Sequence, residues 1–311
     1  MLHRQGLILA ALVAVGLGFF GLPAQAQPFM QGPKKCQECH EAEVTVWEGT
    51  KHFASFREVH KSDKAKDIVA AVGGEKNMKK NELCNQCHYS LIGEEMKAEA
   101  GPSCESCHGA SSDWYPIHND YGGKDVKRED ETAEHKTKRI ADAAAAGMIW
   151  PHERYDIALN CMSCHGLDRP NVDGDTLAKM LAAGHPAKPD YELVQYSQGS
   201  VLHRFYPPDV TVNKPLDAAG LAEAYIQGAA AKLVTASAAL AKSSDPAYQA
   251  FQQKRIDLAR QGIEAVGDMA EAQALLTDPS DANARALVAA IKGQDLSGKV
   301  GSLLPDPGTY K

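Results

Sequence analysis

Residues 101–118, GPSCESCHGASSDWYPIH, hold two cysteines and two histidines. The run from Cys104 to His108 has the C-x-x-C-H pattern of c-type haem attachment. Two thiols three residues apart on a helical turn can bond to the two vinyl groups of one porphyrin, and the next imidazole then reaches the iron. The second histidine of the stretch, His118, is left over and needs a different function.

The same pattern occurs four times and accounts for all eight cysteines. Disulfides are usual in exported proteins, and cysteine-only zinc or iron–sulfur sites are a second alternative, but neither requires a histidine after each cysteine pair. We therefore predict four covalently attached haem c groups. The cysteines that attach them are Cys36, Cys39, Cys84, Cys87, Cys104, Cys107, Cys161 and Cys164, and the proximal iron ligands are His40, His88, His108 and His165.

The N-terminus predicts export. Arg4 precedes an apolar run, and Ala24-Gln25-Ala26 then forms a small-residue cleavage site, so residues 1–26 resemble a secretory signal peptide. An uncleaved N-terminal anchor is the alternative. We expect a periplasmic protein without a membrane span after cleavage, and loss of Arg4 changes the net charge from -7 to -8. Such a charge disfavours nucleic acid and favours a basic redox partner.

The composition predicts a mainly α fold in two parts, a tetrahaem cytochrome domain over 27–206 and an alanine-rich helical domain over 207–311. Prolines at 207, 208 and 215 mark the boundary. In the second part we expect helices over about 218–242, from Asp245-Pro246 onward, and over 281–292. A heptad-like stripe from Ile256 to Ala270 follows the middle helix. This part is either a helical hairpin or bundle packed on the haem domain, or a docking or homo-oligomerisation module.

Candidates for the second axial ligands are the seven histidines outside the signal and the motifs: His52, His60, His118, His135, His152, His185 and His203. Residues 41–52 have helical periodicity, so His40 and His52 would lie about 18 Å apart. Two imidazole nitrogens on one iron are only about 4 Å apart. If His52 is an iron ligand, it must therefore serve another haem; the alternative is a histidine at the end of a surface helix. For His118 a neighbouring haem is also the easier target.

The order of these motifs resembles the tetrahaem cytochrome c-554 family, which consists of periplasmic electron carriers associated with hydroxylamine oxidation. The resemblance rests on C-x-x-C-H-x6-W-x2-T-x-H over 36–52 and on G-x2-C-E-S-C-H-G over 101–109. It implies that His118 caps the first haem and His52 caps the third. It also implies a downstream histidine on the fourth haem and a five-coordinate second haem.

Two downstream histidines are available in this chain. We predict His185 on the fourth haem, because it follows His165 by twenty residues, and His203 as a sixth ligand of the second haem. His152 is a further candidate, and His185 and His203 could instead be surface residues. His135 lies in a charge run, which is typical of a solvated face.

The leading function is electron transfer between redox partners through closely packed haems. The alternative is a reductase or oxidoreductase of nitric oxide, nitrite or hydroxylamine at a five-coordinate haem, with Tyr89 or His152 as proton source. Multihaem nitrite reductases usually carry a proximal lysine at the active haem, whereas all four motifs here end in histidine. A subunit of an extracellular cytochrome filament is a third hypothesis, which the spare histidines disfavour.

Overall fold

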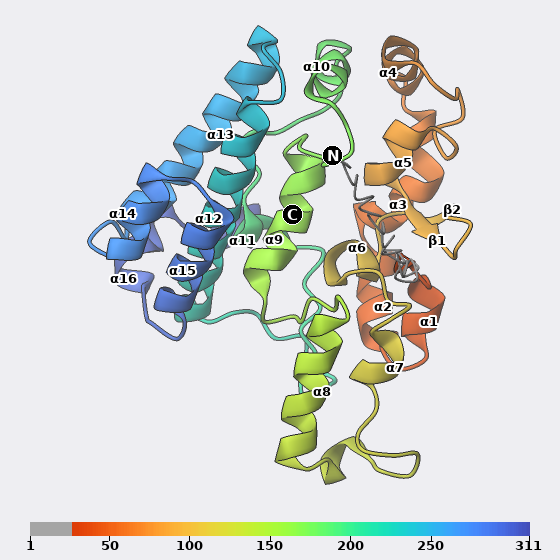
Figure 1. The fold of residues 1–311 in the computed structure, drawn as a ribbon, viewed down its shortest axis with the longest axis vertical. Helices are drawn as coiled ribbons and strands as arrows, with labels where there is room; N and C mark the ends of the chain where they lie inside the picture. The colour runs from red at the N-terminus through yellow and green to blue at the C-terminus, as the bar shows by residue number, and fades with distance from the viewer. Residues whose placement is uncertain (1–26) are drawn as a thin grey trace, which may run out of the picture.

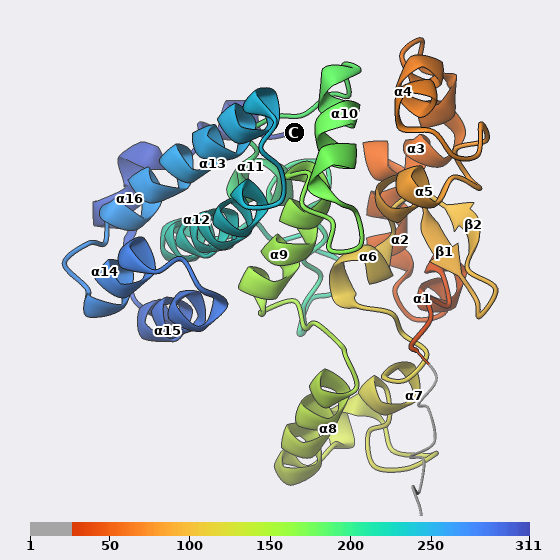
Figure 2. The same cartoon turned by 45° about the horizontal axis from the view of Figure 1, so that its top comes forward.

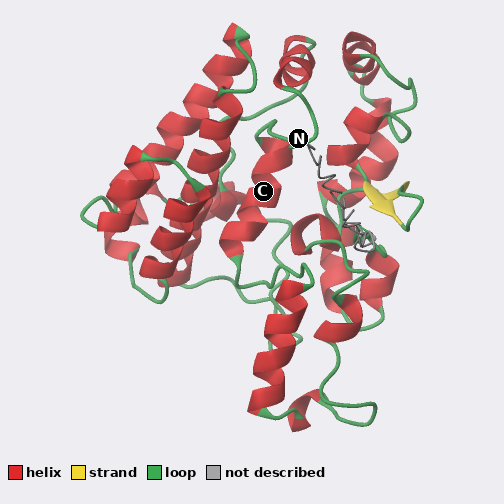
Figure 3. Cartoon of the chain, viewed as in Figure 1, coloured by secondary structure: helices red, strands yellow, loops and turns green. Residues whose placement is uncertain are grey.

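The computed structural model describes residues 27–311, so the predicted signal peptide lies outside the described residues. Within this range the chain is mainly helical, with a single small sheet (Figure 3). The expected mainly α fold is confirmed. Helices in the described range are too short or too polar to cross a membrane.

The N-terminal part carries the first three motifs on short helices. They and the two strands are α1 (Pro33–Gln37), α2 (Glu41–Glu48), α3 (Lys51–Glu58), α4 (Ala65–Val72), α5 (Glu82–His88), β1 (Ser90–Ile92), β2 (Lys97–Ala100), α6 (Cys104–His108) and α7 (Tyr115–His118). The strands pair antiparallel, with Leu91 opposite Ala98. The helix expected to run through 41–52 is interrupted at Gly49, and Thr50 caps α3 by accepting a 3.2 Å hydrogen bond from the Phe53 amide.

The middle of the chain forms α8 (Ala133–Ala145), α9 (Arg154–His165), α10 (Gly174–Ala182) and α11 (Leu193–Ser197). Helix α9 ends with the fourth motif and packs against both α6 and α12. It therefore stands between the N-terminal helices and the C-terminal ones, as both views show (Figures 1 and 2). Helices α7 and α8 pack together and project away from the rest of the fold.

The C-terminal part contains α12 (Ala218–Leu240), α13 (Pro246–Glu264), α14 (Ala270–Thr277), α15 (Asp281–Ile291) and α16 (Ser297–Val300). Asp245 caps α13 as expected, because its carboxylate accepts from the Ala247 and Tyr248 amides at 3.0 and 2.9 Å. The predicted stripe is wrong at its end. Helix α13 stops at Glu264, and Ala270 is an exposed residue at the start of α14.

Single-turn 3-10 helices complete the secondary structure at Val59–Lys61, Arg128–Asp130, Gly301–Leu303 and Pro307–Thr309.

The largest apolar core lies between α9 and the C-terminal helices. Tyr155 and Met162 of α9 are buried against Ile226, Leu233 and Ile263 of α12 and α13. Alanines on α12 allow this close packing, and even the Gly228 position is filled, since a Cβ there would lie 2.6 Å from Leu193. The C-terminal helices therefore share a core with the helix that carries the fourth motif.

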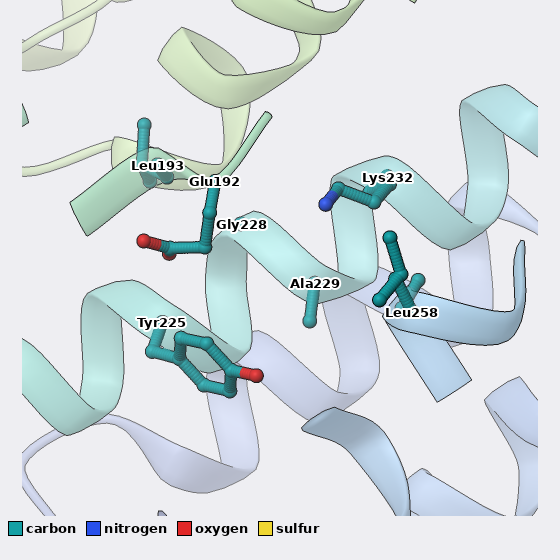
Figure 4. A pocket seen from close by; sticks show the side chains of 8 residues that line it. Glu192, Leu193, Tyr225, Gly228, Ala229, Lys232 and Leu258 are labelled. Atoms are coloured by element: carbon teal, nitrogen blue, oxygen red, sulfur yellow. The ribbon is translucent and has the colours of Figure 1, made fainter. Parts of the chain in front are cut away.

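A small cavity of about 20 Å³ remains between α11 and α12 (Figure 4). Glu192, Tyr225 and Lys232 line it. The space suffices for about one water molecule. Burial lowers the pKa of the Lys232 ammonium to about 8, although the nearby Glu192 carboxylate acts in the opposite direction.

Candidate haem-binding site

All twelve cysteines and histidines of the four motifs line one connected cavity of about 1920 Å³. A site for a single drug-sized ligand usually measures roughly 300–1,000 Å³. Four of the seven further histidines, His52, His118, His185 and His203, line the same cavity, and so does His152. His60 and His135 are not among the residues that line it. The cavity therefore has room for several large groups and collects the residues that would hold them.

The motif thiols lie next to each other across motifs. None of the eight cysteines forms a disulfide in the described part of the chain. Contact with a facing thiol and burial raise the pKa of Cys36, which faces Cys104, and of Cys87, which faces Cys164. The same causes raise the pKa of Cys107, which faces Cys161. The first motif therefore contacts the third, the third contacts the fourth, and the fourth contacts the second. The spatial order of the motifs is first, third, fourth, second.

Imidazole rings face each other in pairs across the cavity. Two imidazoles on one iron should have ring centres roughly 6 Å apart, because each metal–nitrogen bond is about 2 Å and each ring centre lies about 1 Å further out. The observed separations are 6.0 Å for His52 and His165, 5.8 Å for His88 and His185, and 6.2 Å for His108 and His203. Each pair joins a motif histidine with a histidine from elsewhere in the chain.

Three of these pairings differ from the sequence-based expectations. His52 lies beside His165 and not beside His108. The break at Gly49 starts a new helix there, and Gly101 packs on the His52 carbonyl so closely that a Cβ would come within 1.9 Å of its oxygen. This backbone contact fixes the start of α3 and directs its first turn toward the end of α9.

His185 was expected beside His165 but lies beside His88. The reason is the direction of α10, which packs on α4. Its residues Leu177 and Met180 belong to an apolar cluster, and Val72 of α4 and Leu83 of α5 pack against that cluster. The chain therefore leaves α10 next to the second motif.

His203 was expected beside His88 but lies beside His108. It belongs to the loop over 199–217, which folds back on itself through Asn213. The Asn213 side chain accepts from the Arg204 amide at 2.8 Å and donates to the Leu202 carbonyl at 2.6 Å.

His118 and His40 occupy the remaining part of the cavity. Burial lowers the pKa of His118, and the charge of His40 lowers it further. This proximity agrees with the expected pairing of His118 with the first motif.

The protonation of several imidazoles suits iron ligation. Nδ1 of His108 lies 2.8 Å from the Ile149 carbonyl, Nδ1 of His118 lies 2.7 Å from that of Tyr115, and Nδ1 of His203 lies 2.6 Å from that of Val201. A hydrogen bond from Nδ1 fixes the tautomer that leaves Nε2 free for a metal. Burial also lowers the pKa of His88, His108 and His165 to about 4, so these rings are neutral at pH 7.

Glu105, inside the third motif, has a structural role that the sequence reasoning missed. Its buried carboxylate accepts hydrogen bonds from the backbone amides of Gln31, Gly32 and Ser111 at 2.9, 2.7 and 2.8 Å. It thereby ties α6 to the residues just before the first motif. Trp47 acts similarly, because its indole donates to the Pro102 carbonyl at 2.9 Å. The glutamate inside the third motif and the tryptophan after the first motif are the residues that could have indicated these contacts.

A stack of aromatic rings adjoins the fourth motif. The Tyr191 ring lies 4.4 Å from the His165 ring at an interplanar angle of 15°, and Tyr196 stacks on Tyr191, also at 4.4 Å. Tyr191 is buried and restricts rotation of the His165 imidazole. Sequence periodicity gave no indication of this contact.

Repeated C-x-x-C-H helices around one cavity, with paired imidazoles, define a c-type cytochrome of the multihaem class. Residues 35–109 match the family model described as cytochrome c554 and c-prime. The chain is 30% identical over 172 residues to cytochrome c-554 of Nitrosomonas europaea, which covers 51% of this chain and 66% of that protein. No solved structure matches the chain. The chain belongs to the cytochrome c-554 family and binds haem c covalently.

Proposed function

We propose that the protein is an exported tetrahaem cytochrome that carries electrons between redox partners. The four haems would be attached to Cys36 and Cys39, Cys84 and Cys87, Cys104 and Cys107, and Cys161 and Cys164. The iron ligands would be His40 with His118, His88 with His185, His108 with His203, and His165 with His52.

The observation that carries this proposal is the spacing of the imidazole pairs. Ring separations of 5.8 to 6.2 Å fit two imidazoles on one iron. Such an iron has no open coordination position. Haem supplies an iron that exchanges one electron, while its ligands and their burial set the potential. The histidines around it would hold that iron in one coordination state and would keep substrates away from it.

The thiol contacts support a route through the molecule. Adjacent motifs follow the order first, third, fourth, second. Electrons would therefore enter and leave near the first and second motifs, which are the two ends of this line. Donor and acceptor are expected to be redox proteins, as is usual for a carrier without an open iron.

Electron paramagnetic resonance on the oxidised protein tests the proposal, together with the haem-to-protein ratio from the pyridine haemochrome spectrum. We expect four haems per chain, all low-spin. Fewer than four haems, or a high-spin signal that integrates to one haem, would contradict it.

The reductase alternative needs one iron with an open side. The family resemblance implies this for the second haem, but here the His185 ring lies 5.8 Å from the His88 ring. Tyr89, one of the two suggested proton sources, does not line the cavity. Its hydroxyl is buried beside Phe56, and burial raises its pKa to about 12. These positions favour electron transfer over catalysis.

A further inference from the structure

The cavity is lined by basic residues although the chain as a whole is acidic. Among the residues that line it, ten are lysines or arginines, whereas only Glu41, Glu43 and Glu105 are acidic. The whole chain has a net charge of -7. The three hydrogen bonds of Glu105 to backbone amides already satisfy that carboxylate. The charge around the cavity therefore suits an occupant that carries several negative charges.

Two arginines in this lining have buried nitrogen atoms without hydrogen-bond partners among the described residues. These atoms are Nε of Arg169 and Nη1 of Arg204. An unpaired buried donor costs about 1–3 kcal/mol, and more when it carries charge. Most buried donors in proteins have partners, so a ligand or water molecule that reaches these two guanidinium groups would account for both atoms.

Arg204 lies next to the pair formed by His108 and His203. Arg204 directly follows His203, and its backbone is fixed by the hydrogen bond from its amide to Asn213. Arg154 is close enough for its charge to interact unfavourably with that of Arg204. Its contact with Glu223, at 3.6 Å, is too long for a strong ion pair. An anion bound in the cavity near these two like charges would be stabilised by both of them.

The guanidinium group of Arg169 lies between the second and fourth motifs. Nη1 of Arg169 donates to the Ser163 hydroxyl at 3.2 Å, inside the fourth motif. Arg169 and the Cys87 and Cys164 thiols line the same cavity. The neighbouring acid, Asp168, is engaged by Lys242. Arg169 is therefore free to bind an acidic group that enters the cavity.

We propose that Arg204 and Arg169 bind the propionate carboxylates of the haems, Arg204 at the site of His108 and His203, and Arg169 at the adjoining sites of His88 and His165. The inference rests on the proposed haem content. Arginine suits this task because its planar fork of donors matches a carboxylate. These contacts would fix how each porphyrin is rotated in its site, which the cysteines alone constrain only at one edge.

Infrared difference spectroscopy between the oxidised and reduced protein tests the proposal. The haem carboxyl groups can be labelled by growing the cells on 5-aminolaevulinic acid with carbon-13 at its carboxyl carbon. In Arg204→Gln and in Arg169→Gln, the labelled carboxylate bands should shift relative to the wild type, each variant moving a different band. Arg57→Gln is the matched control, because Arg57 is exposed and does not line the cavity, and its bands should equal those of the wild type.

The same samples separate this inference from the haem proposal. Four low-spin haems with unchanged labelled bands would overturn the role of the arginines and leave the haem proposal intact. Fewer haems in the wild type would overturn the haem proposal itself. If the glutamine variants do not mature, Arg204→Lys and Arg169→Lys provide the test. In these variants the point charge of lysine replaces the planar donor fork of arginine, which must also shift the labelled carboxylate band. Bands in the lysine variants identical to the wild type would overturn the inference.

Discussion

The His52 ring lies 6.0 Å from the His165 ring, although His52 follows the first motif and His165 ends the fourth. Helix α3 is thus connected to α9 through a position suited to a shared iron. A similar connection pairs His185 with His88, which lie 97 residues apart in the sequence. Each proposed haem would therefore link two distant parts of the chain, so haem attachment and tertiary structure depend on each other.

The first prediction concerns the assignment of His52 and His203 to two different haems. In the structure these histidines lie at different sites, those of His165 and His108. We expect His52→Ala and His203→Ala to abolish different low-spin signals in the electron paramagnetic resonance spectrum, and the double variant to have two high-spin haems. A double variant with fewer than two high-spin haems would contradict this assignment. His60→Ala, at an exposed residue that does not line the cavity, should retain all low-spin signals.

The second prediction concerns access to the second haem. Because His185 faces His88, the reduced wild-type protein should not bind carbon monoxide. His185→Ala should bind one molecule per chain, which is measured by the change in the Soret absorption. His135→Ala is the control, since that ring contacts Glu131 away from the cavity. Stoichiometric binding by the wild type would favour the reductase alternative.

The sequence was sufficient to predict the haem-attachment residues, because C-x-x-C-H is a local pattern whose residues lie on one helical turn. It was also sufficient for the Asp245 cap and for the end of α15 near Gly293, where φ is 73°. The histidine pairs were not predictable in the same way. His185 was assigned by its closeness in sequence to His165, but packing of Leu177 and Met180 on α4 turns the chain elsewhere. Tertiary packing decides this direction, and a single sequence gives little information about it.

The third prediction concerns Glu105. Replacing it with Gln removes the charge that three backbone amides stabilise, and the amide group brings donors that face those same amides. We expect a loss of about 2–4 kcal/mol in the free energy of unfolding, since hydrogen bonds to charged groups contribute about 1.5–3 kcal/mol each and do not add fully. Guanidinium unfolding followed by far-ultraviolet circular dichroism measures it. The control Glu99→Gln, at an exposed strand position, should change stability little. Equal stabilities of the two variants would contradict the role of Glu105.

The last prediction is a pH dependence of the C-terminal helices, which originates at Lys232. Its side chain is 5% exposed, and burial lowers its pKa from 10.5 to about 8. The unfolded chain therefore binds more protons than the folded one between pH 8 and 10.5, and the contribution of this group to stability rises with pH over that range. Below pH 8 the folded protein carries the full cost of a buried charge. The shift corresponds to roughly 3 kcal/mol, a net value that already includes the compensating charge of Glu192.

Lys232→Met should accordingly stabilise the protein by about 1–3 kcal/mol at pH 7, since methionine fills similar space without a charge. The difference from the wild type should shrink as the pH rises from 8 to 10.5 and disappear above 10.5, where the lysine is neutral in both states. Guanidinium unfolding at a series of pH values measures both quantities. Lys292→Met is the matched control, because that side chain is exposed, and its stability should follow the wild type at every pH. A stabilisation by Lys232→Met that did not change with pH would show that packing, and not charge burial, is its cause.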